Sequence, residues 1–377
     1  MIKKILFPGI LILLFSSSIF AQEKIELTWY NATELGIEGK GWADANTNTP
    51  YDRLPKYAEK KVPEGVWQRG LNSSGMNVSF ASDATMIVIR WKVRHPSISS
   101  PYLSSMAVAG LDLYVREGDK WFWAAAKPPN AAKKEGAPAG PPDTTETFLR
   151  GLSNKLREYR LYLPIYNGVE LVEIGVPKGS KFSKAVEKET KKPIVFYGTS
   201  IVQGSSATRP GMTYVAQLNR RLDRRVINLG FSGLCKMEPE MGDLLAELDP
   251  AMFVIDCLPN MNVKEVPGRP VDLVKRIRKA RPNTPIVLVE NPGFSQTLWN
   301  QSVRDSVDQK NKLLAEEFGK LKQDGIQGLY YVKGGNLFGS TGESTVDGIH
   351  PTDLGFTIYA DVLEPVLRKI LSEHGSK

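Results

Sequence analysis

The chain has 377 residues, of which 41% are hydrophobic and 24% charged, with a formal net charge of +8. This length exceeds what one hydrophobic core usually organises, so it predicts two domains. The densest basic stretch, 275–281, has Val274 and Ile277 at helical spacing on its other face. We expect it to be the solvated face of a helix, which argues against a nucleic-acid partner.

The N-terminus has the pattern of a secretory signal peptide over residues 1–21. Lys3 and Lys4 precede an apolar run, and the small residue Ala21 stands where signal peptidase would cut. The run is far shorter than the roughly 20 residues that span a bilayer, and no later segment is apolar enough to do so. We therefore expect an exported protein, periplasmic or secreted, without a membrane span.

Residues 22–185 have the pattern of an antiparallel, jelly-roll-like β-sandwich. Apolar and polar side chains alternate over 87–93 and 111–116, and this period of two is typical of half-buried strands. Asn167-Gly168 favours the positive φ values of a type I′ turn, which predicts a hairpin. The Pro- and Gly-rich stretch 127–147 can neither pair as a strand nor propagate a helix, so we expect a long exposed loop there.

A polar run at 183–192 marks the predicted domain boundary, and the pattern changes after it. Apolar runs follow at 194–197, 226–229, 252–255 and 286–289, each with a helical pattern after it. This alternation indicates an α/β domain over 186–377, in which helices cover both faces of a parallel sheet. Ligands bind such sheets at the carboxyl ends of the strands, where the candidate residues below are expected to lie.

The first of these apolar runs leads into a turn with one serine at its tip. Gly198 and Gly204 bracket Ser200, so the turn can expose the Ser200 hydroxyl at the mouth of the sheet. Ser200 could equally cap the helix that follows, which is a common use of serine. The GxSxG elbow of α/β-hydrolases is not matched, because residue 202 is Val. These residues alone leave both interpretations open.

A base for this hydroxyl is found near the C-terminus. A serine nucleophile needs a base, and the base needs a carboxylate that orients it. His374 is close to the chain end and His95 lies in the strand-rich domain, which leaves His350, three residues after Asp347. Pro351 favours an extended His350, and Thr352 or Asp353 can cap the last helix. The alternative is a loop histidine beside a turn aspartate.

From Pro193 onward the sequence resembles the SGNH hydrolases, also called GDSL esterases, in four blocks that occur in the same order. The blocks are Gly198-Thr199-Ser200-Ile201, Asn228-Leu229-Gly230-Phe231-Ser232-Gly233, Asp256-Cys257-Leu258-Pro259-Asn260-Met261, and Asp347 with His350. Thr199 stands where the family usually has Asp, and the third block departs from the usual Gly-x-Asn-Asp.

The resemblance implies a three-layer α/β/α fold and ester hydrolysis through an acyl-serine intermediate, with no cofactor and no metal. It assigns catalysis to Ser200, Asp347 and His350. The oxyanion hole is assigned to the backbone N–H groups of Ser200 and Gly233 and to the side-chain amide of Asn260, since such an intermediate needs several preorganised donors. The histidines also lack the spacing of a metal site.

The strand-rich domain has a precedent of its own. Gly110-Leu111-Asp112-Leu113-Tyr114 is similar to a motif in the sandwich domain that precedes some bacterial SGNH domains. The domain also holds four tryptophans, Trp42, Trp67, Trp121 and Trp123. They could form a sugar-stacking surface, although tryptophans in a sandwich more often belong to the core.

These observations predict an exported esterase that removes a short acyl group, most simply acetyl, from a saccharide. One alternative is a lipolytic esterase or thioesterase on longer chains, but no apolar loop that could form a lid is present. Another is a glycan-binding protein with a degenerate hydrolase domain. Cys235 and Cys257 follow the second and third blocks closely, so their loops are expected to converge, and either a disulfide or two free thiols fit.

Overall fold

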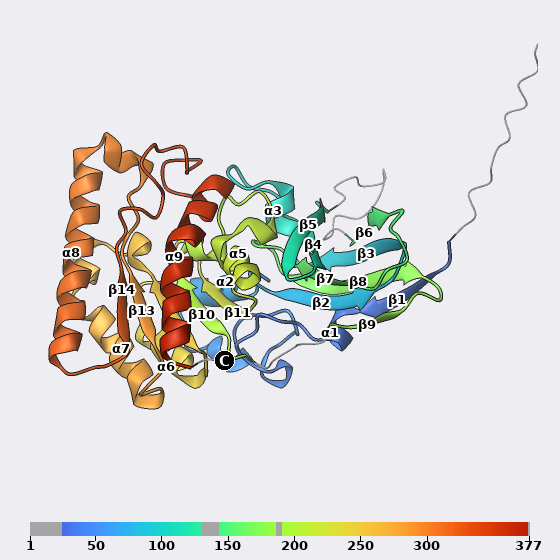
Figure 1. The fold of residues 1–377 in the computed structure, drawn as a ribbon. Helices are drawn as coiled ribbons and strands as arrows, with labels where there is room; N and C mark the ends of the chain where they lie inside the picture. Colours follow the sequence, from blue (N-terminus) through green and yellow to red (C-terminus); the bar gives the residue numbers. More distant parts are fainter. Residues whose placement is uncertain (1–24, 130–142, 186–190, 376–377) are drawn as a thin grey trace, which may run out of the picture.

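A computed structural model describes residues 25–129, 143–185 and 191–375. The predicted signal peptide lies outside these residues. The described chain forms a β-sandwich and an α/β part that lie side by side (Figure 1). None of the helices in the described ranges is long and apolar enough to cross a membrane.

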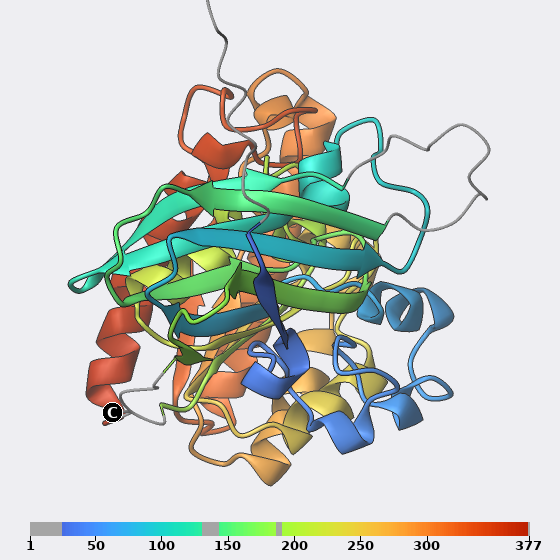
Figure 2. The same ribbon diagram turned by 90° about the vertical axis from the view of Figure 1, so that its right-hand side faces the viewer.

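The first part is an antiparallel sandwich of two sheets, as predicted. One sheet has the strand order β1-β8-β3-β6 and the other β5-β4-β7-β2-β9, and Figure 2 looks toward them. The strands are β1 Leu27–Asn31, β2 Asn77–Ser82, β3 Met86–Val93, β4 Leu111–Glu117, β5 Lys120–Lys127, β6 Asp143–Arg150, β7 Arg157–Tyr162, β8 Val169–Pro177 and β9 Phe182–Lys184. In β3 every second side chain, from Ile87 to Val93, is fully buried in the core between the sheets.

The predicted hairpin at Asn167-Gly168 is wrong. Strands β7 and β8 belong to different sheets, and neither residue has a positive φ. The Asn167 side chain is buried and donates to the carbonyls of His95 (2.9 Å) and Ser97 (3.1 Å). At Gly168 a Cβ would lie 2.5 Å from the Leu71 carbonyl oxygen. Asn167 and Gly168 therefore fit the close packing at the point where the chain passes from the sheet of β7 to the sheet of β8.

The predicted loop over 127–147 is too long at both ends. Lys127 ends β5, and residues 143–147 belong to β6, where Thr144 pairs with Trp91. The run of β-branched threonines favours a strand as soon as the prolines end. The stretch between these ends, 130–142, lies outside the described residues.

Residues 32–76 include four short helical segments, which are α1 Ala32–Leu35, η1 Asp44–Asn46, η2 Lys56–Ala58 and α2 Glu64–Gly70. Several apolar side chains of this segment pack into the core of the α/β part, not the sandwich. Trp42 and Trp67 are among them and are only 8% and 5% exposed. They belong to a core, which is the more common use of tryptophan, and are closed to a sugar ring.

The α/β part has a five-stranded parallel sheet of order β11-β10-β12-β13-β14, as predicted. Its strands are β10 Ile194–Gly198, β11 Val226–Gly230, β12 Met252–Asp256, β13 Ile286–Val289 and β14 Leu329–Val332. Its helices are α4 Ser200–Gln203, α5 Tyr214–Arg221, α6 Pro239–Glu247, α7 Arg269–Ala280, α8 Gln301–Gln323 and α9 Asp353–Glu373; α3 Ser105–Ala109 belongs to the sandwich part.

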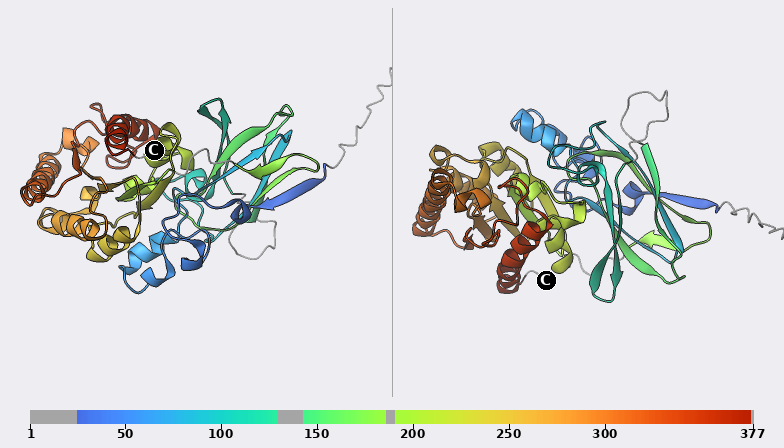
Figure 3. Two further views of the ribbon diagram at one scale, coloured as in Figure 1. Left: turned by 60° about the horizontal axis from the view of Figure 1, so that its bottom comes forward. Right: turned by 90° about the horizontal axis from the view of Figure 1, so that it is seen from above.

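Helices α5 and α9 pack on one face of the parallel sheet, and α6, α7 and α8 pack on the other. Figure 3 shows these three layers beside the two sheets of the sandwich. Alternate residues of β10 point to opposite faces, with Phe196 in one core cluster and Tyr197 in the other. Burial on both faces explains why the strands of this part are continuous apolar runs in the sequence.

Candidate active site

Ser200 lies at the point where the order of the parallel strands reverses. It follows β10, and β10 is flanked by β11 and β12, which precede Gly233 and Asn260. Open α/β sheets bind ligands at this type of crevice. The N-cap of α4 is Thr199, whose hydroxyl accepts from the Ile201 N–H, so Ser200 is not the capping residue. Thr199 thus keeps the capping oxygen that an aspartate would supply there.

The structure brings Ser200, His350 and Asp347 together in one hydrogen-bonded chain. Ser200 Oγ lies 3.0 Å from His350 Nε2, and His350 Nδ1 lies 2.7 Å from Asp347 Oδ2. Since Nδ1 faces a carboxylate, it carries the proton, and Nε2 is then an acceptor for the Ser200 hydroxyl. The arrangement can move the hydroxyl proton to the imidazole as Oγ attacks an ester carbonyl.

The Asp347 carboxylate also organises the loop that carries His350. Its Oδ1 accepts from the backbone N–H of His350 (2.7 Å) and of Ile349 (3.0 Å). Partial burial raises the pKa of Asp347, but these bonds and the imidazole outweigh it, so its pKa lies below the ordinary value. Asp347 therefore stays ionised at neutral pH and can stabilise an imidazolium.

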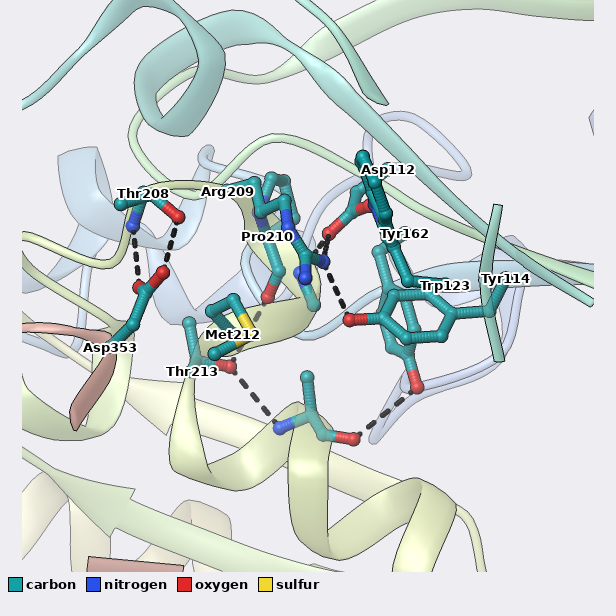
Figure 4. Close-up of polar contacts among 12 residues, drawn as sticks. Asp112, Tyr114, Trp123, Tyr162, Thr208, Arg209, Pro210, Met212, Thr213 and Asp353 are labelled. Carbon is teal, nitrogen blue, oxygen red and sulfur yellow. Dashed lines mark hydrogen bonds and ion pairs between the residues drawn. The ribbon is translucent and has the colours of Figure 1, made fainter. Parts of the chain in front are cut away.

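The start of α9 fixes the other end of this loop. Of the two residues predicted to cap this helix, Thr352 is the N-cap. Its hydroxyl accepts from the Gly355 N–H at 3.3 Å. The second candidate, Asp353, has another role, because its carboxylate accepts from the backbone N–H and the hydroxyl of Thr208. Figure 4 shows this contact. It connects the His350 loop to the segment that follows the Ser200 helix.

The loops that carry Gly233 and Asn260 converge. A disulfide joins Cys235 to Cys257 with a Cα–Cα distance of 5.5 Å, and the Asn260 amide donates to the Leu234 carbonyl. Gly233 has a φ of +75° and is exposed, which suits an oxyanion donor on a tight turn. A primary amide has two N–H donors, so Asn260 keeps one beyond its bond to Leu234.

The assignment of Asn260 to the oxyanion hole predicts that Asn260→Ala lowers kcat by on the order of 10²-fold with little change in KM, because one donor would be removed. Steady-state kinetics with an aryl acetate measure both constants. Because Asn260 also bonds the Leu234 carbonyl, the thermal unfolding of the variant should be compared with the parent protein. A loss confined to KM would make Asn260 a substrate-positioning residue instead.

Arg53 supports the second block, although no local pattern in the sequence indicates this role. Its guanidinium is fully buried and donates to the carbonyls of Asn228 (3.0 Å) and Gly230 (2.8 Å) on the edge strand β11. Burial lowers its pKa to about 9. The residue satisfies edge carbonyls that have no neighbouring strand, and so fixes the backbone that leads to Gly233.

The sandwich motif forms a clasp with the α/β part, defined here as Asp112, Tyr114, Arg209 and Gly211. Figure 4 labels Asp112, Tyr114 and Arg209. Asp112 Oδ2 accepts from Arg209 Nη1 (2.7 Å) and from the Gly211 N–H (2.8 Å), and the Tyr114 hydroxyl lies 2.6 Å from Arg209 Nη1. Trp123, 55% exposed, donates its indole N–H to Asp112 Oδ1. The motif therefore docks the two parts of the chain.

A cleft of about 460 Å³ opens beside His350. Its lining comes mainly from the sandwich part, including Arg69 and Tyr166, while the α/β part adds Ser205 and Ser232. Within the described ranges, no group of three or more His, Cys, Asp or Glu side chains could hold a metal ion.

Comparison with known proteins assigns the family. Residues 191–368 match the GDSL-like Lipase/Acylhydrolase family, and residues 27–182 match the GxDLY family, the N-terminus of SGNH-hydrolase-type esterases. A GDSL-like lipase from Bacteroides ovatus has a similar structure, with a TM-score of 0.84 and 34% sequence identity over 92% of this chain and 98% of that one. No curated protein matches the chain in sequence.

Two more distant structures share the fold. The salicylyl-acyltransferase SsfX3 from a tetracycline biosynthetic pathway has a TM-score of 0.67 and 20% identity over 86% of this chain and 90% of that one. An acetyl xylan esterase from Butyrivibrio proteoclasticus has a TM-score of 0.57 and 12% identity over 92% of this chain and 99% of that one. The chain belongs to the SGNH (GDSL) esterase family, in the branch with an N-terminal GxDLY domain.

Proposed function

We propose that the protein is an exported acetylesterase that acts on a carbohydrate ester through an acyl-serine intermediate. Ser200 attacks the ester carbonyl, His350 takes the hydroxyl proton and returns it to the leaving alcohol, and Asp347 holds the imidazole. The observation that carries the proposal is the hydrogen-bonded chain from Ser200 Oγ through both ring nitrogens of His350 to Asp347. In the second step His350 takes a proton from a water molecule, which attacks the acyl-enzyme and releases the acid and free Ser200.

Export is supported by two independent features. The N-terminal pattern is that of a signal peptide, and the Cys235–Cys257 disulfide is of a kind that persists in oxidising compartments. In this proposal 1–21 is removed, 22–185 is the accessory domain and 186–377 the catalytic domain.

A polar alcohol fits the cleft better than a long acyl chain. Most residues that line the cleft carry a hydroxyl, amide or basic group, and its aliphatic residues are Leu103 and Val108, although polar and apolar atoms contribute similarly to its surface. A fatty acyl chain would need a continuous apolar surface, since each buried methylene contributes about 0.8 kcal/mol. The fold shared with an acetyl xylan esterase supports the same substrate class.

Acyl-chain length separates this proposal from the lipolytic alternative. We expect kcat/KM to fall progressively from acetyl to octanoyl aryl esters, because an extra methylene in a small pocket changes discrimination by about 1–3 kcal/mol. Acetylated oligosaccharides should be turned over faster than aryl acetates, because remote binding energy lowers the barrier. An optimum at octanoyl, with no acetate released from any glycan, would favour lipolysis.

A further inference from the structure

We propose that Arg69 is a specificity residue of the cleft and that the saccharide ester carries a carboxylate, which Arg69 binds. This inference rests on the proposed function, because it names the class of saccharide for the same site. The substrate would be the acetyl ester of an acidic sugar, with its carboxylate on the side of the cleft formed by α2.

The charges around the cleft favour an anion. Arg69 is a permanent cation, and none of the cleft's lining residues is Asp or Glu. His95 adds an exposed imidazole to the same lining. An anionic ligand would therefore meet a positive charge and N–H donors here, without a carboxylate to repel it.

The Arg69 side chain is free to bind a ligand. It is exposed, and within the described ranges its guanidinium makes no hydrogen bond or ion pair with another side chain. Arg94, which directly follows β3, is different, because its guanidinium lies 2.7 Å from the Asp52 carboxylate. An arginine fork pairs with a carboxylate through two parallel hydrogen bonds, which makes it a selective partner for this group.

The backbone of Arg69 is held in place, so its side chain starts from a fixed point in the wall of the cleft. Arg69 lies in the last turn of α2, and its carbonyl accepts from the buried Arg53 guanidinium at 2.5 Å and from the Asn72 N–H at 3.1 Å. Arg53 in turn binds the backbone of β11, which leads to the Gly233 loop. The backbone of Arg69 is thus connected to the strand before the candidate oxyanion loop through the Arg53 guanidinium.

Tyr166 adds a phenol to the lining of the cleft. Its hydroxyl is buried beside Ser205 and Ser232, and burial raises its pKa, while the two serine side chains oppose this rise. The positive charge of Arg69 also lowers the pKa of Tyr166, because the guanidinium lies near the phenol.

The test compares two substrates that differ in one charge, an acetylated uronic-acid oligosaccharide and its neutral carboxyl-reduced counterpart. The measured quantity is the ratio of kcat/KM for the acidic and the neutral substrate. We expect this ratio to be about 10–100 in the parent protein, since hydrogen bonds to charged groups contribute about 1.5–3 kcal/mol. It should fall to near one in Arg69→Gln and recover in part in Arg69→Lys, which keeps the charge.

Arg150→Gln is the matched control, because Arg150 is an exposed arginine on β6 outside the lining of the cleft. It should keep the ratio of the parent protein, and added salt should lower that ratio in both. A parent ratio near one, or a ratio unchanged in Arg69→Gln, overturns the assignment of Arg69. If the parent protein does not turn over aryl acetates, the proposed function itself is contradicted.

Discussion

Ser200→Ala is expected to lower kcat for an aryl acetate by on the order of 10⁶-fold, and His350→Ala by a similar factor, because the nucleophile and its base act as a unit. Asp347→Asn should lower kcat by roughly 10⁴-fold, since the imidazole would then be held in the wrong tautomer. Substrate binding should change little in all three variants. Steady-state kinetics with a full titration of substrate separate kcat from KM.

Labelling by a fluorophosphonate identifies the activated hydroxyl directly. The probe should modify Ser200 alone, and mapping of the adduct by mass spectrometry distinguishes it from Ser205 and Ser232, which line the cleft beside His350. Those serines have no imidazole at hydrogen-bonding distance among the described residues, so they are internal controls. Unchanged turnover in Ser200→Ala contradicts the mechanism, and a parent protein that neither labels nor turns over esters favours the glycan-binding alternative.

Local patterns in the sequence predicted the fold where burial is regular. The alternation in β3 follows from one buried face, and the apolar run of β10 follows from two, so each strand has a period that can be read without its partners. Asp347 and His350 could be paired with Ser200 because a nucleophile, its base and the orienting carboxylate are chemically complementary. The separation of 150 positions between Ser200 and His350 does not affect this chemical complementarity.

The incorrect predictions occur where tertiary packing overrides a local preference. Asn167-Gly168 is a favourable turn sequence, but here the asparagine is buried and binds the backbone of His95. Arg53 could not be identified because its partners are backbone carbonyls about 175 positions away, and backbone groups carry no sequence signature. The clasp was visible only as a motif, since nothing near Asp112 indicates that Arg209 is its partner.

Outside the proposed catalytic residues, we expect the largest effect from substitutions in the clasp, and this effect is a loss of stability. The Asp112 side chain is fully buried, and its partner Arg209 is 19% exposed. Burial raises the pKa of Asp112, while Arg209 opposes this shift. The ion pair as such therefore contributes little net stability, but removal of the carboxylate leaves Arg209 and the Gly211 N–H without their acceptor.

Asp112→Ala is accordingly expected to destabilise the protein by about 3 kcal/mol, the lower end of the range for breaking a buried pair, because water can reach part of Arg209. This corresponds to a fall in Tm of roughly 6–12 °C on the scale of a domain of 150–250 residues. Differential scanning calorimetry measures it. Asp305→Ala on the exposed surface of α8 is the control and should change stability by no more than about 0.5 kcal/mol.

The same variant tests whether the sandwich positions the catalytic residues. Arg209 and Gly211 lie in the segment between α4 and α5, and Thr208 in that segment binds Asp353 at the start of α9. If the clasp holds the Ser200 helix and the His350 loop in position relative to each other, Asp112→Ala should lower kcat. The effect should be present at temperatures well below the melting transition of the variant. Asp112→Asn keeps an acceptor for the Gly211 N–H and should retain more of the activity. A destabilised variant with unchanged kcat would limit the clasp to domain docking.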